Sequence, residues 1–105
     1  DIIWLYSVFS HTTEADMRIY LKDFHRVLSK SGKIFFTTFV EKDVSNFSIN
    51  PDGYVFEKCK GPLHIVRYNE AYLFSILNEL GFSVEKFTHG TEADGQSALY
   101  LSKKA

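Results

Sequence analysis

The chain has 105 residues, of which 45% are hydrophobic and 24% charged, as is typical of one compact globular unit. Its 12 basic and 13 acidic residues are interspersed and leave a net charge of −1, so we expect no nucleic-acid partner. Cys59 is the only cysteine, which excludes an internal disulfide and a cysteine-pair zinc site; we expect no metal. No apolar run approaches the roughly 20 residues that span a bilayer, so we expect a cytoplasmic protein without membrane contact.

The first nine residues, Asp1 to Phe9, are apolar on both faces of an extended chain, which predicts a strand inside a sheet. Such a strand needs a neighbour on each side, and one of them is not obvious in this sequence. The only methionine is Met17. We therefore expect this chain to be the back half of a larger domain.

A helix is predicted next, because Thr13 can cap its start and Asp16 follows three residues later. Apolar side chains then recur on one helical face, at Met17, Tyr20, Leu21, Phe24, Val27 and Leu28. We expect Gly32 to end the helix as a left-handed cap.

The segment from Ile34 to Val40 is β-branched and aromatic throughout, which predicts a second buried strand. Two apolar strands joined by a helix predict a parallel, right-handed crossover. The polar character of residues 41–67 predicts an insert or flap, in which residues 54–58 and 63–67 could form a short hairpin.

The last third of the chain predicts one more helix and two strands. Asn69 can cap the helix and Gly81 can end it. The short link between strands 82–88 and 96–102 implies an antiparallel hairpin. The predicted fold is α/β, in the order β-α-β-insert-α-β-β, within one unit covering residues 1–105.

Three segments resemble a known family: Asp1-Ile2-Ile3, then Ser7 to His11, then Phe24 to Lys33. Together they are similar to the second half of class I S-adenosylmethionine-dependent methyltransferases. The resemblance implies a partial Rossmann-like sheet that supplies strands 4, 5, 7 and 6 of the family order 3-2-1-4-5-7-6. The chain departs from the family at Ser29, Ser31 and Lys33, and it has no counterpart of the Gly-rich cofactor loop or of the acidic residue that holds the ribose.

The same resemblance implies candidate site residues. The stretch that would approach the cofactor, S-adenosylmethionine, is Leu5, Tyr6 and Ser7, although apolar strand residues usually pack in a core. His11 corresponds to a position near the transferred methyl group; it could orient a substrate or act as a base, or simply bond to the amides of the next helix. The residues that would line the acceptor pocket, or else pack in a flap, are Thr38, Phe39, Tyr54, His64 and Tyr68.

The resemblance implies methyl transfer from S-adenosylmethionine to a small-molecule acceptor, carried out by a complete protein that includes the missing N-terminal half of the domain. The isolated chain is expected to be inactive, because half of the cofactor crevice is absent, and to self-associate. The alternative is a non-catalytic α/β interaction module that self-associates, or recruits another chain, through the edge of its first strand.

Overall fold

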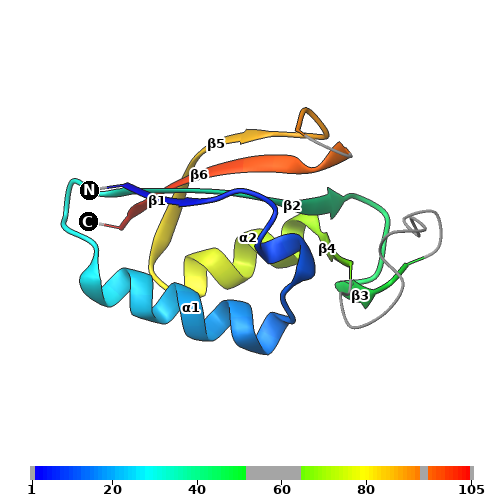
Figure 1. Ribbon diagram of the computed structural model, residues 1–105, viewed down its shortest axis with the longest axis horizontal. Helices are drawn as coiled ribbons and strands as arrows, with labels where there is room; N and C mark the ends of the chain where they lie inside the picture. Colours follow the sequence, from blue (N-terminus) through cyan, green and yellow to red (C-terminus); the bar gives the residue numbers. More distant parts are fainter. Residues whose placement is uncertain (1, 52–64, 93–94, 105) are drawn as a thin grey trace.

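The computed structural model describes residues 2–51, 65–92 and 95–104. Its elements are β1 (Ile2–Leu5), η1 (Phe9–His11), α1 (Glu14–Val27), β2 (Lys33–Glu41), β3 (Phe47–Ile49), β4 (Val66–Asn69), α2 (Glu70–Glu79), β5 (Phe82–Thr88) and β6 (Ser97–Lys103). The strands form one sheet, and both helices lie against the same face of it (Figure 1).

The long strand β2 organises the sheet. β1 runs parallel to the first half of β2, and β4 runs parallel to its last three residues. On the path β3-β4-β2-β6-β5, β6 is antiparallel to β2, and β5 is antiparallel to β6. Taken with β1, the order β1-β2-β6-β5 matches the expected strands 4, 5, 7 and 6, and the predicted parallel crossover and terminal hairpin are both confirmed.

The start of α1 follows the prediction, but its end does not. The Thr13 side chain accepts a hydrogen bond from the Asp16 amide, as a capping residue does. The helix then ends at Val27, with Leu28 already extended, and Gly32 does not adopt a positive φ. The left-handed cap predicted at Gly32 is therefore wrong. Glycine is needed there for space, because a Cβ atom would lie 2.4 Å from Cδ1 of Leu28.

Both predicted ends of α2 are confirmed. The Asn69 side chain accepts a hydrogen bond from the Tyr72 amide at 3.0 Å, and Gly81 ends the helix with a φ of +90°. A side chain at residue 81 would also be crowded, since its Cβ would lie 2.7 Å from Nε2 of His25.

The first strand is shorter than predicted, because it ends at Leu5 rather than Phe9. Ser7 takes a positive φ of 59°, which turns the chain out of the sheet before η1 begins. Ile3 and Leu5 pack against the core, whereas Ile2 and Trp4 are 73% and 63% exposed. Among the described residues, β1 pairs with β2 alone, so the second neighbour that an interior strand needs is not among them.

The insert between β2 and α2 contains more structure than the sequence predicted. Phe47–Ile49 forms β3, antiparallel to β4, within a stretch expected to be loop. The predicted hairpin at 54–58 and 63–67 falls largely outside the described residues, which resume just before β4.

The two helices are joined by a polar network on the surface of the core. Arg18 of α1 bonds both to Glu14 on its own helix and to Glu79 of α2, and the Tyr72 hydroxyl donates to Glu14. The neighbouring carboxylates of Glu79 and Glu14 raise the pKa of the Arg18 guanidinium. Across the described part of the chain, neither helix has the length and apolar character needed to cross a membrane.

Candidate functional site

One rim of the sheet collects the carboxyl ends of four strands. β1, β2 and β4 are mutually parallel, and β5 runs in the same sense because β6 is antiparallel to both β2 and β5. In open α/β sheets, ligands bind outside the carboxyl ends of the parallel strands. The segment from Leu5 to His11 leaves β1 at this rim and is the natural place to look for a ligand site.

Ser7 is held at the rim by a closed triangle of hydrogen bonds. Its backbone amide donates to Oγ1 of Thr37 at 2.8 Å, and the Thr37 hydroxyl donates to Oε1 of Gln96 at 2.9 Å. The Gln96 amide group completes the triangle by donating to Oγ of Ser7 at 2.5 Å. Thr37 lies on β2 and Gln96 immediately precedes β6, so the triangle ties the turn after β1 to two other strands.

This triangle accounts for the unusual backbone of Ser7. A residue with a side chain rarely adopts positive φ, and it does so where surrounding contacts hold it there. Thr37 and Gln96 are buried, at 0% and 2% exposure, so the bond between them is shielded from water, while their two bonds to Ser7 are part-buried. Because the Ser7 oxygen accepts from Gln96, its hydroxyl proton is left to donate to a ligand at the rim.

The other residues predicted for the cofactor lie on the same segment. Leu5 is half-buried and packs against the core, which agrees with the alternative that apolar strand residues serve packing. Tyr6 is exposed at 41%. His11 is the last residue of η1, half-buried, just before the cap of α1. The segment thus carries both a positioned hydroxyl at Ser7 and an imidazole four residues later.

The residues predicted for the acceptor pocket are buried where they are described. Thr38, Phe39 and Tyr68 are at most 3% exposed, and Tyr68 belongs to the main core, where its ring packs against Phe47. The hydroxyl groups of Thr38 and Tyr68 have no hydrogen-bond partner among the described residues. Burial raises the pKa of the Tyr68 phenol. Tyr54 and His64 lie outside the described residues.

Thr37 and Gln96 were not predicted as site residues. Thr37 is one of two consecutive threonines in an apolar strand, and Gln96 is a lone amide at the start of another. Their role depends on three hydrogen bonds whose partners are separated by 30, 59 and 89 positions in the chain, and no local pattern reveals such contacts.

The chain also resembles solved structures along its whole length. A methyltransferase from Burkholderia thailandensis, which acts on N1 of 1,6-didemethyltoxoflavin and was solved with that compound and S-adenosylhomocysteine, superposes with a TM-score of 0.73 at 13% identity. The match covers 100% of this chain and 44% of that one. This chain has the fold of part of a methyltransferase domain.

Two further methyltransferases show the same relationship. The glycopeptide N-methyltransferase MtfA, solved with S-adenosylmethionine, matches with a TM-score of 0.68 at 12% identity, over 97% of this chain and 57% of its own. The methyltransferase CalO6 matches with a TM-score of 0.62 at 15% identity, over 97% of this chain and 35% of its own. The chain therefore spans between about a third and a little over half of these methyltransferases. Its sequence matches no family model and no curated protein.

Proposed function

We propose that this chain forms the carboxyl-terminal half of an S-adenosylmethionine-dependent methyltransferase domain, and that the complete protein methylates a small-molecule acceptor. The observation that carries the proposal is the strand order β1-β2-β6-β5 with its terminal antiparallel hairpin. Three methyltransferases share this fold over almost the whole chain, and two of them were solved with the methyl donor or its product.

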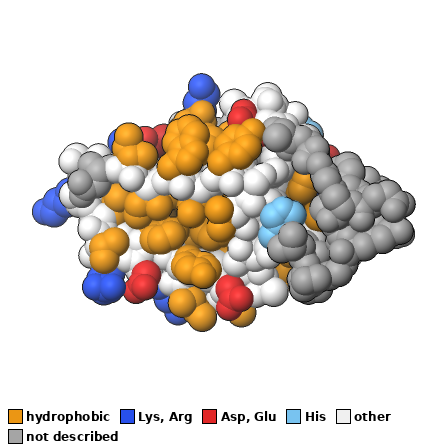
Figure 2. All heavy atoms as spheres, viewed as in Figure 1, with side chains coloured by type: hydrophobic (Ala, Val, Ile, Leu, Met, Phe, Trp, Pro, Cys, Tyr) orange, Lys and Arg blue, Asp and Glu red, His pale blue; other side chains and the backbone are white. Residues whose placement is uncertain are grey.

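The surface beside β1 supports the idea of a missing half. Figure 2 shows hydrophobic side chains gathered over β1 and α1. The large apolar residues exposed in this region are Ile2, Trp4, Tyr6, Val8, Ile19, Tyr20 and Val27. A contiguous apolar surface next to an unpaired strand edge is typical of a protein interface. The N-terminal half of the domain would pair with β1 and cover this surface.

S-adenosylmethionine, when bound, supplies a methyl group bonded to a positively charged sulfur. Leu5, Tyr6 and Ser7 would form the wall of the donor site, and the Ser7 hydroxyl, whose oxygen accepts from Gln96, would donate a hydrogen bond to the ligand. His11 would accept the proton that the acceptor loses as its nucleophilic atom bonds to the methyl carbon, while the bond between that carbon and sulfur would break and release S-adenosylhomocysteine. Thr38, Phe39 and Tyr68 are buried, so they would support the acceptor side from the core, and Tyr54 and His64 would contact the acceptor. Most of the rate would come from alignment of the two reactants.

The test measures release of S-adenosylhomocysteine by the complete protein, supplied with S-adenosylmethionine and pooled small molecules bearing hydroxyl or amino groups. We expect product release that depends on an acceptor, and a fall in kcat of roughly 100-fold in His11→Gln, the lower end for loss of a general base. His25→Gln is the matched control, because it makes the same substitution at a histidine of α1 that packs edge-on against Phe82 of β5 and has no proposed role in the reaction. The proposed function would be contradicted if no pool of acceptors gave S-adenosylhomocysteine. The proposed role of His11 would be contradicted if His11→Gln and His25→Gln had equal rates.

A second candidate function is favoured by the same apolar surface. The edge of β1 that has no partner in the part of the chain that the structure describes, with Trp4 and Ile2 exposed, could recruit another protein chain without any catalysis. The coding sequence upstream of Asp1 separates the two proposals. A strand followed by a Gly-rich turn and, about 20 residues later, an acidic residue favours the enzyme; an unrelated domain favours the interaction module.

A further inference from the structure

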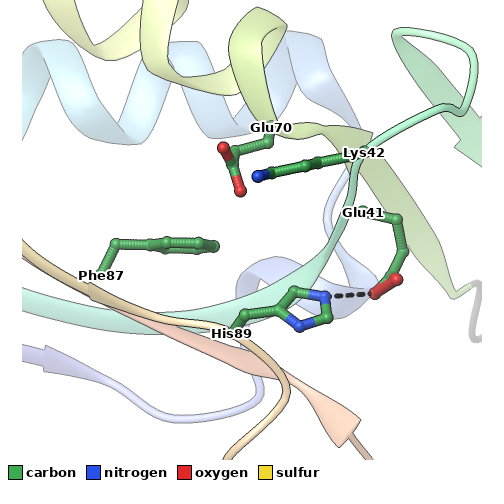
Figure 3. A pocket seen from close by; sticks show the side chains of 5 residues that line it. All are labelled: Glu41, Lys42, Glu70, Phe87 and His89. Atoms are coloured by element: carbon green, nitrogen blue, oxygen red, sulfur yellow. Dashed lines mark hydrogen bonds and ion pairs between the residues drawn. The ribbon is translucent and has the colours of Figure 1, made fainter.

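A separate cavity lies at the same rim of the sheet, beyond the end of β2. It has a volume of about 530 Å³, within the range of small-molecule sites, which is roughly 300–1,000 Å³. The residues that line it are Glu41, Lys42, Glu70, Phe87 and His89 (Figure 3). They come from the carboxyl end of β2, the first turn of α2 and the carboxyl end of β5. None of them takes part in the triangle around Ser7.

The cavity is distinct from the proposed methyl-donor site. Thr37, which holds Ser7, and Glu41, which lines the cavity, are four residues apart on one strand, a distance of about 13 Å. A ligand in the cavity would therefore lie beside the donor site and not within it, next to Phe39 and Tyr68 on the ladder between β2 and β4. The experiment below measures its binding alone, without methyl transfer.

Three contacts hold the walls of the cavity. The His89 imidazole is hydrogen-bonded through Nε2 to a carboxylate oxygen of Glu41 at 2.8 Å, which joins the ends of β5 and β2. Phe87 packs edge-on against Phe74 of α2, with ring centroids 5.3 Å apart. The next turn of the chain is anchored where the Gly90 amide donates to Oγ of Ser97. The cavity is thus bounded by side chains with defined positions.

The polar groups in the cavity are mostly hydrogen-bond acceptors. When Nε2 of neutral His89 donates to Glu41, its Nδ1 carries a lone pair and can only accept. Glu41 and Glu70 contribute carboxylates, and Lys42, which points toward Glu70 in Figure 3, contributes the only ammonium group among the lining residues. Two carboxylates against one ammonium leave an excess of negative charge, and the Phe87 ring adds a surface that attracts both apolar groups and cations.

We propose that this cavity binds a small molecule that carries an amino group next to an aromatic or apolar part. The ligand's ammonium would bond to Glu70 and Glu41, and its apolar part would rest on Phe87. A carboxylate in the same position would face two like charges, and a neutral hydroxyl would gain no charge attraction. The cavity should therefore select amines over acids and alcohols of the same shape.

The experiment compares three probes of equal size, benzylamine, benzyl alcohol and benzoate, titrated into the ¹⁵N-labelled protein. We expect benzylamine to shift the amide signals of Phe87, His89 and Gly90 in a saturable way, and benzoate to leave them unchanged. Glu70→Gln and Glu41→Gln should each weaken benzylamine binding about two- to fivefold, the effect of one charge pair in a half-exposed site.

The control variant is Glu85→Gln, which removes the same charge from β5. Glu85 lies four residues before His89 in the chain and forms an ion pair with Lys33. It does not line the cavity. It should bind benzylamine as the unaltered protein does. The proposal is overturned if benzoate binds as well as benzylamine, if no probe shifts these signals, or if Glu70→Gln and Glu41→Gln bind as Glu85→Gln does.

Discussion

Two adjacent threonines of β2 should respond in opposite ways to the same substitution. Thr37 accepts a hydrogen bond from the Ser7 amide and donates one to Gln96. The Thr38 hydroxyl is equally buried but has no partner among the described residues. Replacement by valine keeps the shape of each side chain and its preference for strands, so only the hydroxyl group is tested.

Thr37→Val should lower the free energy of unfolding by about 1–3 kcal/mol. The substitution leaves the Ser7 amide and the buried Oε1 of Gln96 without their partners, and an unsatisfied buried polar group costs that much. Thr38→Val should be neutral or stabilising by about 1 kcal/mol, since it removes a hydroxyl that is buried without a hydrogen-bond partner among the described residues. Thr38→Val is thus the matched control, one residue away.

Urea denaturation of the protein measures both effects. For a small domain the slope is about 1–3 kcal/mol per M, so the two midpoints should differ by roughly 1 M. Adding Gln96→Leu to Thr37→Val should cost less than the sum of the single changes, with a coupling energy of at least about 0.5 kcal/mol. Equal midpoints for the two valine variants, or strict additivity with Gln96→Leu, would refute the triangle.

Three further outcomes follow from the fold. Tyr68→Phe removes a buried hydroxyl without a partner among the described residues, so the free energy of unfolding should rise by about 1 kcal/mol. Because burial raises the pKa of Tyr68, the unaltered protein should also lose stability as the pH rises above about 10, and Tyr68→Phe should not show this loss. A Tyr68→Phe variant that is less stable than the unaltered protein would contradict this account. Gly81→Ala should cost more than about 1 kcal/mol by thermal unfolding and more than Gly95→Ala, since both have positive φ but only residue 81 lies against His25; equal costs would argue against crowding. Residues 1–105 alone should self-associate in light scattering, and Trp4→Lys should reduce the association while Ile49→Lys does not; a monomer at high concentration would contradict this use of the β1 edge.

The order of elements could be predicted from the sequence because it rests on local patterns. The cap at Thr13, the cap at Asn69 and the positive φ at Gly81 are each decided by a residue and its near neighbours. The segment from Ile34 to Val40 is β-branched and aromatic throughout, which likewise predicts a buried strand from local pattern alone. The order of the strands within the sheet, by contrast, came from the resemblance and not from these local features.

What the sequence did not reveal depends on contacts between distant segments. The Ser-Gly at residues 31 and 32 looks like a helix stop, yet α1 ends earlier and Gly32 serves the packing of Leu28. Ser7 leaves the first strand because Thr37 and Gln96 hold it. The cavity beside His89 likewise forms only when β2 and β5 end at the same rim.

The most direct test of the central claim is calorimetric titration of S-adenosylhomocysteine into the complete protein and into residues 1–105 alone. If this chain supplies one wall of a shared donor site, the complete protein should bind with micromolar affinity and residues 1–105 alone should give no measurable heat. Binding of similar strength by residues 1–105 alone would show that the site lies elsewhere. Absence of binding by the complete protein would contradict the methyltransferase account.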